Sequence, residues 1–287
     1  MKYLTFPLQH KQAIVLQGDC SGSAADIALL ARLTNTTLLE NNTELPMVVW
    51  EEPGKRPPED AACVYWTKTV KMVYNPEEQN FHLYLKDDSQ LHRHVYGVFM
   101  WQLSTICAAA SALLRGKNVQ LVHCSMLEKD DQALLLLGES GIGKSTSVRR
   151  WQEAGNIACA DDMVLLEYAE DGILVHRLPT WSACRIQLEG RLYPFDPPLK
   201  LKNVFAITRG SDHEYVGEIS RAEFFAQLYR CCFFHYLPIA PNLPKKEQKM
   251  LADAIRKSTA RLTDEFKPLA FFAHLDGDIA KTLGEFL

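Results

Sequence analysis

The first 90 residues alternate short apolar runs with polar or proline-rich stretches. The apolar runs lie at residues 13–16, 47–50 and 81–85. Short runs of this kind, bounded by turn-forming residues, are typical of β-strands. Residues 51–60 contain three prolines and are expected to form an exposed loop, because proline fits neither a regular helix nor a central strand. Helical spacing of apolar residues over 23–34 predicts one helix in this strand-rich N-terminal lobe.

A longer apolar segment follows at residues 95–114 and approaches the length needed to span a bilayer. It contains Gln102, Ser104 and Thr105 and is diluted by Gly97 and by alanines, whereas a membrane span is predominantly apolar throughout. The segment is therefore expected to be a buried helix that ends at Arg115 and Gly116.

After this helix the chain alternates strand-like and helical patterns. Strands are expected at residues 119–124, 133–137, 157–160, 163–166 and 204–207, and helices at 144–153, 221–234 and 245–262. The alternation predicts an α/β fold. We expect two parts: residues 1–90 as the strand-rich lobe, with a possible role in substrate recognition, and residues 91–287 as the domain that carries the chemistry.

A glycine-rich loop stands between the strand expected at 133–137 and the helix expected at 144–153. Its sequence, Gly138–Ser145, matches the phosphate-binding pattern G-x-x-x-x-G-K-[ST] in full. Glycines let backbone amides curl around phosphates, a lysine adds a compact positive charge, and the hydroxyl of Ser145 can ligate Mg²⁺. A chance strand-to-helix turn would need neither the lysine nor the hydroxyl. The residues expected to bind ATP are Gly138, Glu139, Ser140, Gly141, Ile142, Gly143, Lys144, Ser145 and Thr146.

Two acids, Asp161 and Asp162, follow Lys144 by 17 and 18 residues. This distance fits one helix, a short turn and a returning strand, which would place the acids beside the glycine-rich loop. One carboxylate can hold Mg²⁺ and the other can accept the proton of an attacking hydroxyl. Paired acids alone are more often a solvated turn or a helix cap. With the loop upstream we expect Ser145 and Asp162 as metal ligands and Asp161 and Asp162 as catalytic residues with Lys144.

His123 lies fifteen residues before Gly138, on the strand expected next to the loop. From that strand it can reach the side of the site where an acceptor would bind. A single histidine in an apolar strand is, however, as readily a core residue, so this pattern alone leaves both interpretations open.

Together, His123, the loop Gly138–Ser145 and the pair Asp161–Asp162 resemble the catalytic domain of HPr kinase/phosphorylase in residue type and spacing. The resemblance is specific over about residues 119–170. It implies a compact P-loop domain, distantly similar to phosphoenolpyruvate carboxykinase. It further implies that the loop binds ATP phosphates, that one acid is the base toward a serine hydroxyl, that its neighbour serves the metal, and that His123 lies beside them. On the strength of this resemblance His123 is expected to be a catalytic residue together with Asp161, Asp162 and Lys144.

Outside that region the sequence departs from the family. Residues 185–191 stand where the family has Glu-Ile-Arg-Gly-Leu-Gly, so neither the reverse phosphorylase reaction nor HPr as substrate carries over. Residues 179–182, Pro-Thr-Trp-Ser, are similar to smaller HPr-kinase-like proteins found with peptide-modification systems. Candidates for the acceptor or nucleotide site are His176, Arg177, Thr180, Trp181 and Arg185, and candidates for stabilising transferred charge are Arg185, Arg191 and Arg209.

The composition of the chain limits the kinds of partner that we expect it to bind. The formal net charge is −4 and no basic cluster is present, which disfavours nucleic acid. The eight cysteines include no C-x-x-C pair, so they are interpreted as reduced, mostly buried thiols. The N-terminal residues lack a secretion signal, and we expect a cytoplasmic protein without a membrane partner. The aromatic residues after 224 fit either a buried helix or an interface between copies of the chain.

These patterns predict a kinase that uses ATP and Mg²⁺ to phosphorylate a hydroxyl, with a serine of a peptide or small protein as the leading acceptor. Two alternatives remain open: a kinase of small-molecule alcohols or amino acids, and a nucleotide-binding switch that hydrolyses or holds nucleotide without an acceptor. The sequence does not choose between ATP, GTP and diphosphate donors.

Overall fold

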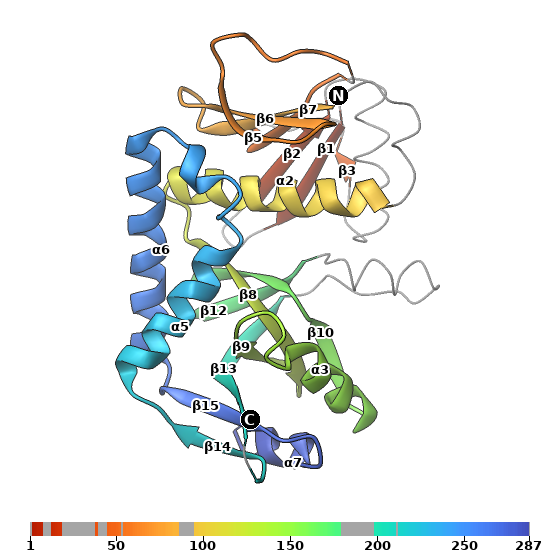
Figure 1. Ribbon diagram of the computed structural model, residues 1–287, viewed down its shortest axis with the longest axis vertical. Helices are drawn as coiled ribbons and strands as arrows, with labels where there is room; N and C mark the ends of the chain where they lie inside the picture. Colours follow the sequence, from red (N-terminus) through yellow and green to blue (C-terminus); the bar gives the residue numbers. More distant parts are fainter. Residues whose placement is uncertain are drawn as a thin grey trace. The chain divides into compact units, whose positions relative to one another are not determined.

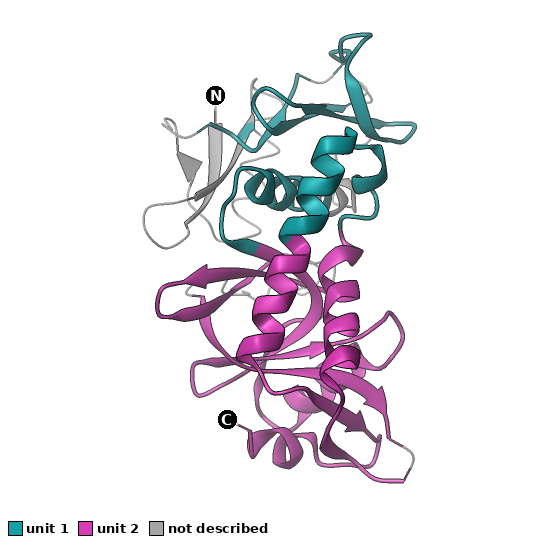
Figure 2. Ribbon diagram, turned by 90° about the vertical axis from the view of Figure 1, so that its left-hand side faces the viewer, with its two compact units in different colours: residues 1–119, 183–195, 236–254 teal, residues 120–182, 196–235, 255–287 magenta. Residues whose placement is uncertain are grey.

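The computed structural model describes residues 2–7, 13–18, 38–39, 45–52, 54–85, 95–178, 198–210 and 212–286. The chain forms two compact units, and each is assembled from separate segments (Figure 2). Unit 1 comprises residues 1–119, 183–195 and 236–254, and unit 2 comprises residues 120–182, 196–235 and 255–287. The predicted division of the chain between residues 90 and 91 stays a prediction. The helix expected over residues 23–34 lies outside the described residues.

Unit 1 is built on a mixed sheet that has seven strands in the described residues (Figure 1). Its strand order is β3 (Leu38–Leu39), β1 (Lys2–Pro7), β2 (Ala13–Gly18), β4 (Val48–Trp50), β7 (Asn80–Leu85), β6 (Val70–Asn75) and β5 (Ala62–Trp66). The strands expected at 13–16, 47–50 and 81–85 are thus confirmed as β2, β4 and β7. A short 3-10 helix, η2 (Ala240–Asn242), packs against β5 through a hydrogen bond from Asn242 to the Val64 carbonyl, 3.0 Å long.

The helix α2 (Val95–Leu114) packs against β2, β4 and β7 of this sheet. Its residues 103–114 are buried, and the polar Ser104 is satisfied there by the indole of Trp50, which donates a 2.9 Å hydrogen bond to its hydroxyl. The helix ends at Leu114, and Gly116, two residues further on, has a φ of 72° that glycine adopts readily. Among the helices that the structure describes, none is long and apolar enough to cross a membrane.

The loop after β4 is irregular, as expected, but one of its residues is not exposed. Glu51 is buried because its carboxylate accepts a hydrogen bond from His82 Nδ1 at 2.8 Å and pairs with the Lys55 ammonium group. The hydrogen bond from His82 and the charge of Lys55 hold the pKa of the Glu51 carboxyl below its usual range, against burial, which raises it.

Replacing Glu51 with glutamine is expected to destabilise the protein at neutral pH by about 1 kcal/mol, because His82 and Lys55 lose a charged partner. Since the folded-state pKa is lowered, this stabilisation is complete above the unfolded-state value of about 4.3 and is lost as pH falls through the folded-state pKa. Urea denaturation at pH 7 and pH 3 measures it, with the exposed Glu52→Gln as control. A difference from wild type that persists undiminished at pH 3 would contradict the charge-based account.

Unit 2 contains the second sheet, eight strands in its described part. Their order is β10 (Ile157–Ala160), β8 (Val119–Lys129), β11 (Met163–Ala169), β12 (Gly172–Arg177), β13 (Leu199–Arg209), β15 (Leu269–Ala273) and β14 (Tyr215–Glu218), and β9 (Gln132–Leu137) pairs with both β8 and β13. Strands β9 and β15 are parallel to β13, while β8 and β9 form an antiparallel hairpin. The chain is therefore a mixed α/β protein with strand-rich sheets, as the sequence predicts at this level.

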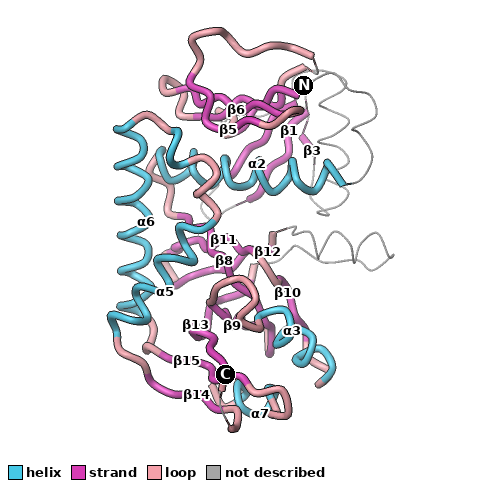
Figure 3. Tube along the Cα trace, in the orientation of Figure 1, coloured by secondary structure: helices cyan, strands magenta, loops and turns pink. Residues whose placement is uncertain are grey.

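Four helices accompany this sheet in the described residues (Figure 3). They are α3 (Lys144–Glu153), α5 (Arg221–Phe234), α6 (Lys245–Glu265, which passes from unit 1 into unit 2) and α7 (Ile279–Gly284). Trp151 of α3 and Leu283 of α7 join Leu134, Leu136 and Phe205 of the sheet in one buried cluster. This apolar contact holds α3 against the sheet and against α7.

Candidate functional site

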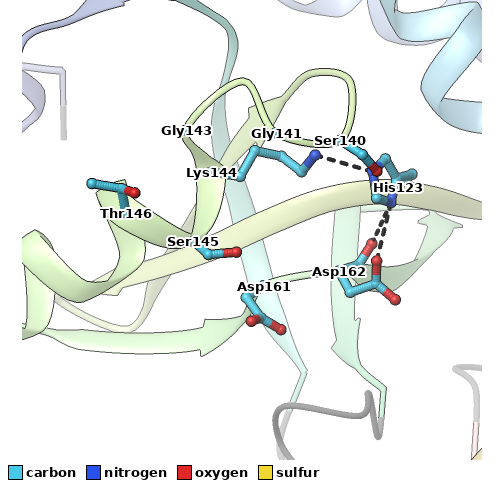
Figure 4. A pocket seen from close by; sticks show the side chains of 9 residues that line it. All are labelled: His123, Ser140, Gly141, Gly143, Lys144, Ser145, Thr146, Asp161 and Asp162. Carbon is cyan, nitrogen blue, oxygen red and sulfur yellow. Dashed lines mark hydrogen bonds and ion pairs between the residues drawn. The ribbon is translucent and has the colours of Figure 1, made fainter.

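The glycine-rich loop connects the end of β9 at Leu137 to the start of α3 at Lys144. A pocket of about 220 Å³ opens beside it (Figure 4). It is lined by His123, Ser140, Gly141, Gly143, Lys144, Ser145, Thr146, Asp161 and Asp162. The structure thus brings together residues from β8, the loop, α3 and the bend between β10 and β11. Gly138, Glu139 and Ile142 belong to the same loop but are not among the lining residues.

Glycine is required at several positions of this loop. Gly141 and Gly143 have φ angles of 81° and 126°, a region that other residues rarely adopt. Gly143 is also the N-cap of α3 and supplies no side-chain hydrogen bond to the helix. Amides of the first helical turn have no partner within the helix. The loop therefore presents backbone donors at a helix N-terminus, the arrangement that favours a bound anion.

Gly138 is restricted by packing rather than by its φ angle. A Cβ atom at this position would lie 2.6 Å from Cγ2 of Ile207 and 2.7 Å from Cγ2 of Ile142. Replacing Gly138 with alanine is therefore expected to cost about 1–3 kcal/mol, a typical overpacking penalty. Thermal and urea denaturation measure the loss. The matched control is Gly284→Ala, where the added Cβ meets only the flexible Lys129 ammonium at 3.1 Å, and equal stability of the two variants would contradict the prediction.

The Lys144 side chain is buried and fully engaged with the loop. Its ammonium group donates to the carbonyl oxygens of Gly138 at 2.7 Å and Glu139 at 3.1 Å, and it lies 3.0 Å from Nε2 of His123. Burial lowers the pKa of the Lys144 ammonium group below its usual range, and the nearby Asp161 and Asp162 act in the opposite direction. The positive charge is thus held at the mouth of the loop rather than in solvent.

His123 connects this lysine to the acidic pair. Its Nδ1 lies 2.9 Å from the carbonyl oxygen of Asp162 and 3.3 Å from Oδ1 of the same residue. Because an ammonium group can only donate, Nε2 accepts from Lys144, and the proton of the neutral ring is on Nδ1, directed at Asp162. The ring also packs against Phe234, with centroids 4.4 Å apart. His123 is therefore a member of the site and not an isolated core residue.

The two acids lie at the bend between β10 and β11. The Asp162 carbonyl accepts from the backbone amide of Cys124 at 3.2 Å, and the Asp161 carbonyl accepts from the Ser125 hydroxyl at 3.4 Å, so β8 holds the bend in place. Burial raises the pKa of the Asp162 carboxyl, but His123, His235 and Lys144 together outweigh it and the net shift is downward. Figure 4 shows the Ser145 hydroxyl and both carboxylates around the same open space.

A further histidine belongs to this group and was not expected from the sequence. His235, at the C-terminal end of α5, is buried, and its Nε2 lies 3.4 Å from the Asp162 carbonyl. Its ring is 5.2 Å from that of His123. Burial lowers the pKa of His235 to about 4, so its imidazole is neutral at physiological pH. No motif spacing marks this residue, because an aromatic-rich helix carries it to the site from far along the chain.

The remaining candidates divide into three groups. His176 and Arg177 do not line the pocket: His176 is buried and hydrogen-bonded to Glu167 at 2.8 Å, and Arg177 is buried in a 2.6 Å ion pair with Glu128. Arg209, at the end of β13, reaches the loop and donates to the Gly141 carbonyl at 3.2 Å. Outside the described residues lie Thr180, Trp181, Arg185 and Arg191.

A family model described as "SynChlorMet cassette protein ScmC" matches residues 87–231, just over half of the chain. This chain belongs to that family. In this member of the ScmC family the matched region includes His123, the whole glycine-rich loop and both aspartates, whereas His235 lies just beyond it. None of the curated proteins matches the chain.

One solved structure similar to this ScmC-family chain is described as "Structure of the Hpr(Ser) kinase/phosphatase from Coxiella burnetii". The two chains are 18% identical, and the match covers 31% of this chain and 66% of that one with a TM-score of 0.26. The chain thus spans slightly less than two thirds of that protein. A likeness of this extent says nothing about activity, which has to be argued from the site itself.

Proposed function

We propose that this chain is a phosphotransferase that uses ATP and Mg²⁺ to phosphorylate a serine hydroxyl of a peptide or small protein. One observation carries the proposal: Lys144, Ser145, Asp161 and Asp162 line a single pocket at the N-terminus of α3. That combination offers phosphate donors, a metal-binding hydroxyl and two carboxylates within one space, which are the parts that phosphoryl transfer requires.

The residues present fit a nucleotide with its metal ion. Gly141 and Gly143 have the positive φ angles of a phosphate cradle, and a Cβ at Gly138 would have no room. Lys144 would reach the outer phosphates by exchanging its loop carbonyls for phosphate oxygens. Ser145 and Asp162 would hold Mg²⁺, which when bound supplies positive charge that offsets the charge of the phosphates. The lowered pKa of Asp162 suits a carboxylate that stays ionised as a ligand.

Asp161 is then the carboxylate left to act on the acceptor. In the proposed reaction the serine oxygen forms a bond to the γ-phosphorus, the bond from that phosphorus to the bridging oxygen of ADP breaks, and the serine proton passes to Asp161. His123 keeps Asp162 oriented through its Nδ1, so that the two acids hold distinct roles.

Two observations other than the geometry of the site support a serine of a peptide or small protein as the acceptor. The motifs resemble HPr kinases and, through Pro179–Ser182, smaller relatives found with peptide modification. The family description names a cassette protein, which is consistent with an enzyme associated with peptide modification. A small-molecule alcohol remains the alternative acceptor.

Arg209 is the arginine best placed to assist. Its exposed guanidinium lies at the loop, 3.2 Å from the Gly141 carbonyl, where it can turn to a transferred phosphoryl group. Replacing Arg209 with alanine is expected to lower kcat on the order of 10²-fold, with a folded protein. Steady-state kinetics measure this, with Arg221→Ala as control, since Arg221 is an exposed arginine paired with Asp264. Equal kcat values for the two variants would exclude the role.

The proposal is tested by incubating the protein with ATP, Mg²⁺ and candidate peptides or small-molecule extract, followed by intact-mass and phosphopeptide analysis. The expected result is an acceptor gaining one phosphoryl group, absent with the Asp161→Asn plus Asp162→Asn variant. Tight nucleotide binding without any transfer would instead indicate the nucleotide-binding switch. Transfer only to a small molecule would retain the kinase and change the acceptor class.

A further inference from the structure

One member of the acidic pair also belongs to a cluster with two histidines, and Mg²⁺, which prefers oxygen ligands, does not account for these histidines. His123, Asp162 and His235 each offer one ligand atom, and these atoms all lie within 4.8 Å of one another. We propose that these three residues form a second metal site, for a divalent transition metal of the zinc class, and that its occupation inhibits phosphoryl transfer. The binding site stands on its own, whereas the inhibition rests on the proposed function.

The donor set selects the class of metal. Two imidazoles and one carboxylate suit zinc and similar divalent transition metals, whereas Mg²⁺ prefers oxygen ligands alone. Nε2 of His123 faces the Lys144 ammonium at 3.0 Å, so Nδ1 is the nitrogen turned toward Asp162. The separation of Nδ1 from Oδ1 of Asp162, 3.3 Å, is close to the distance of about 3.4 Å between two ligands of a tetrahedral zinc ion.

The surroundings also fit a bound ion. Both histidines are buried, while the Asp162 side chain is 38% exposed, which leaves an entry path from the pocket. The Phe234 ring lies 4.4 Å from that of His123 and 5.3 Å from that of His235 and gives both imidazoles an apolar neighbour on one side. When the imidazoles turn to a metal, the Asp162 carbonyl keeps the backbone amide of Cys124 as its donor.

Metal binding at this place would act on the kinase site in two ways. A metal on Nδ1 of His123 displaces the Nδ1 proton, and the neutral ring then carries its proton on Nε2, where it can no longer accept from Lys144. The metal also takes the Asp162 carboxylate, which the proposed Mg²⁺ site needs. Zinc and the productive Mg²⁺ complex are therefore mutually exclusive, and the site makes activity sensitive to transition-metal ions.

The experiment titrates the full chain with Co²⁺ and Zn²⁺ at neutral pH without nucleotide. Visible d–d absorption of Co²⁺ and calorimetry with Zn²⁺ report binding. One equivalent is expected to bind with histidine–carboxylate character, and His235→Gln is expected to weaken it at least about tenfold. The control is His213→Gln, an exposed histidine of the same unit. Should His235→Gln not fold, His123→Gln, measured for metal binding alone, replaces it.

Three outcomes overturn the site: no binding by the wild type, equal binding by His235→Gln, or a thiolate-to-cobalt charge-transfer band, which would assign the metal to cysteines instead. A second arm measures phosphoryl transfer with and without Zn²⁺ for each protein, where Zn²⁺ is expected to inhibit the wild type and to leave the His235→Gln variant at its own zinc-free rate. Binding without inhibition would retain the site and reject its regulatory role. Absence of all transfer would reject the proposed function and leave the binding result intact.

Discussion

Replacing Asp161 with asparagine is expected to lower the rate of phosphoryl transfer by about 10²–10⁴-fold, the usual contribution of a positioned general base. Asparagine keeps the size and the backbone contact to Ser125 but cannot take the proton of the attacking hydroxyl. The affinity for ATP with Mg²⁺ should change little, because Lys144, Ser145 and Asp162 remain. Single-turnover transfer and nucleotide binding, measured on the same preparation, separate the two effects.

The matched control is Asp212→Asn, an exposed aspartate of the same unit, which should behave as the wild type. If Asp161→Asn keeps full activity while Asp162→Asn loses it, the base and the metal ligand are exchanged between the neighbours. If both single variants stay active, the acidic pair is not the catalytic pair and the kinase proposal fails.

Replacing Lys144 with methionine is expected to impair both nucleotide binding and transfer, with kcat falling by about 10²–10³-fold. The buried ammonium group is the one positive charge that the pocket-lining residues of the described structure direct at the loop. Methionine retains the packing volume, so the variant should fold. Titration with a fluorescent nucleotide and steady-state kinetics give the two quantities.

Lys202→Met, an exposed lysine of the same unit, serves as control for the loss of one positive charge. A Lys144→Met protein that binds nucleotide as tightly as the wild type would place the phosphates elsewhere. The loop would then be a structural turn, and the site would need a different explanation.

The positions of the glycine-rich loop and of the two acids could be predicted because they depend on residues that are close together in the sequence. The helix expected over residues 144–153 is α3, the strands expected at 133–137 and 157–160 are β9 and β10, and the acids lie at the bend that follows. Glycine, lysine and hydroxyl positions are fixed by the backbone of one turn. Helix α3, strand β10 and the short connection between them therefore suffice to bring the glycine-rich loop and the two acids together.

Contacts between residues that are far apart in the sequence could not be predicted in this way. His235 reaches Asp162 only because α5 ends there, and Arg209 reaches Gly141 only because β13 lies parallel to β9. Strand pairing depends on the whole sheet and leaves no fixed interval between the partners. Glu51 shows the same limit for burial, because its partner His82 comes from β7, in another part of the sequence.

The pairing of β9 with β13, and of β13 with β15, also bears on how the protein is made. A nascent chain in which the ribosome has translated only as far as β11 already contains the loop, the lysine and both acids, yet it lacks β13, β15 and the α7 residues that pack against α3. The phosphate-binding motif is thus synthesised well before the strands that support it. Nucleotide binding should appear late in translation, and a stalled or truncated chain should carry the complete motif without forming the site.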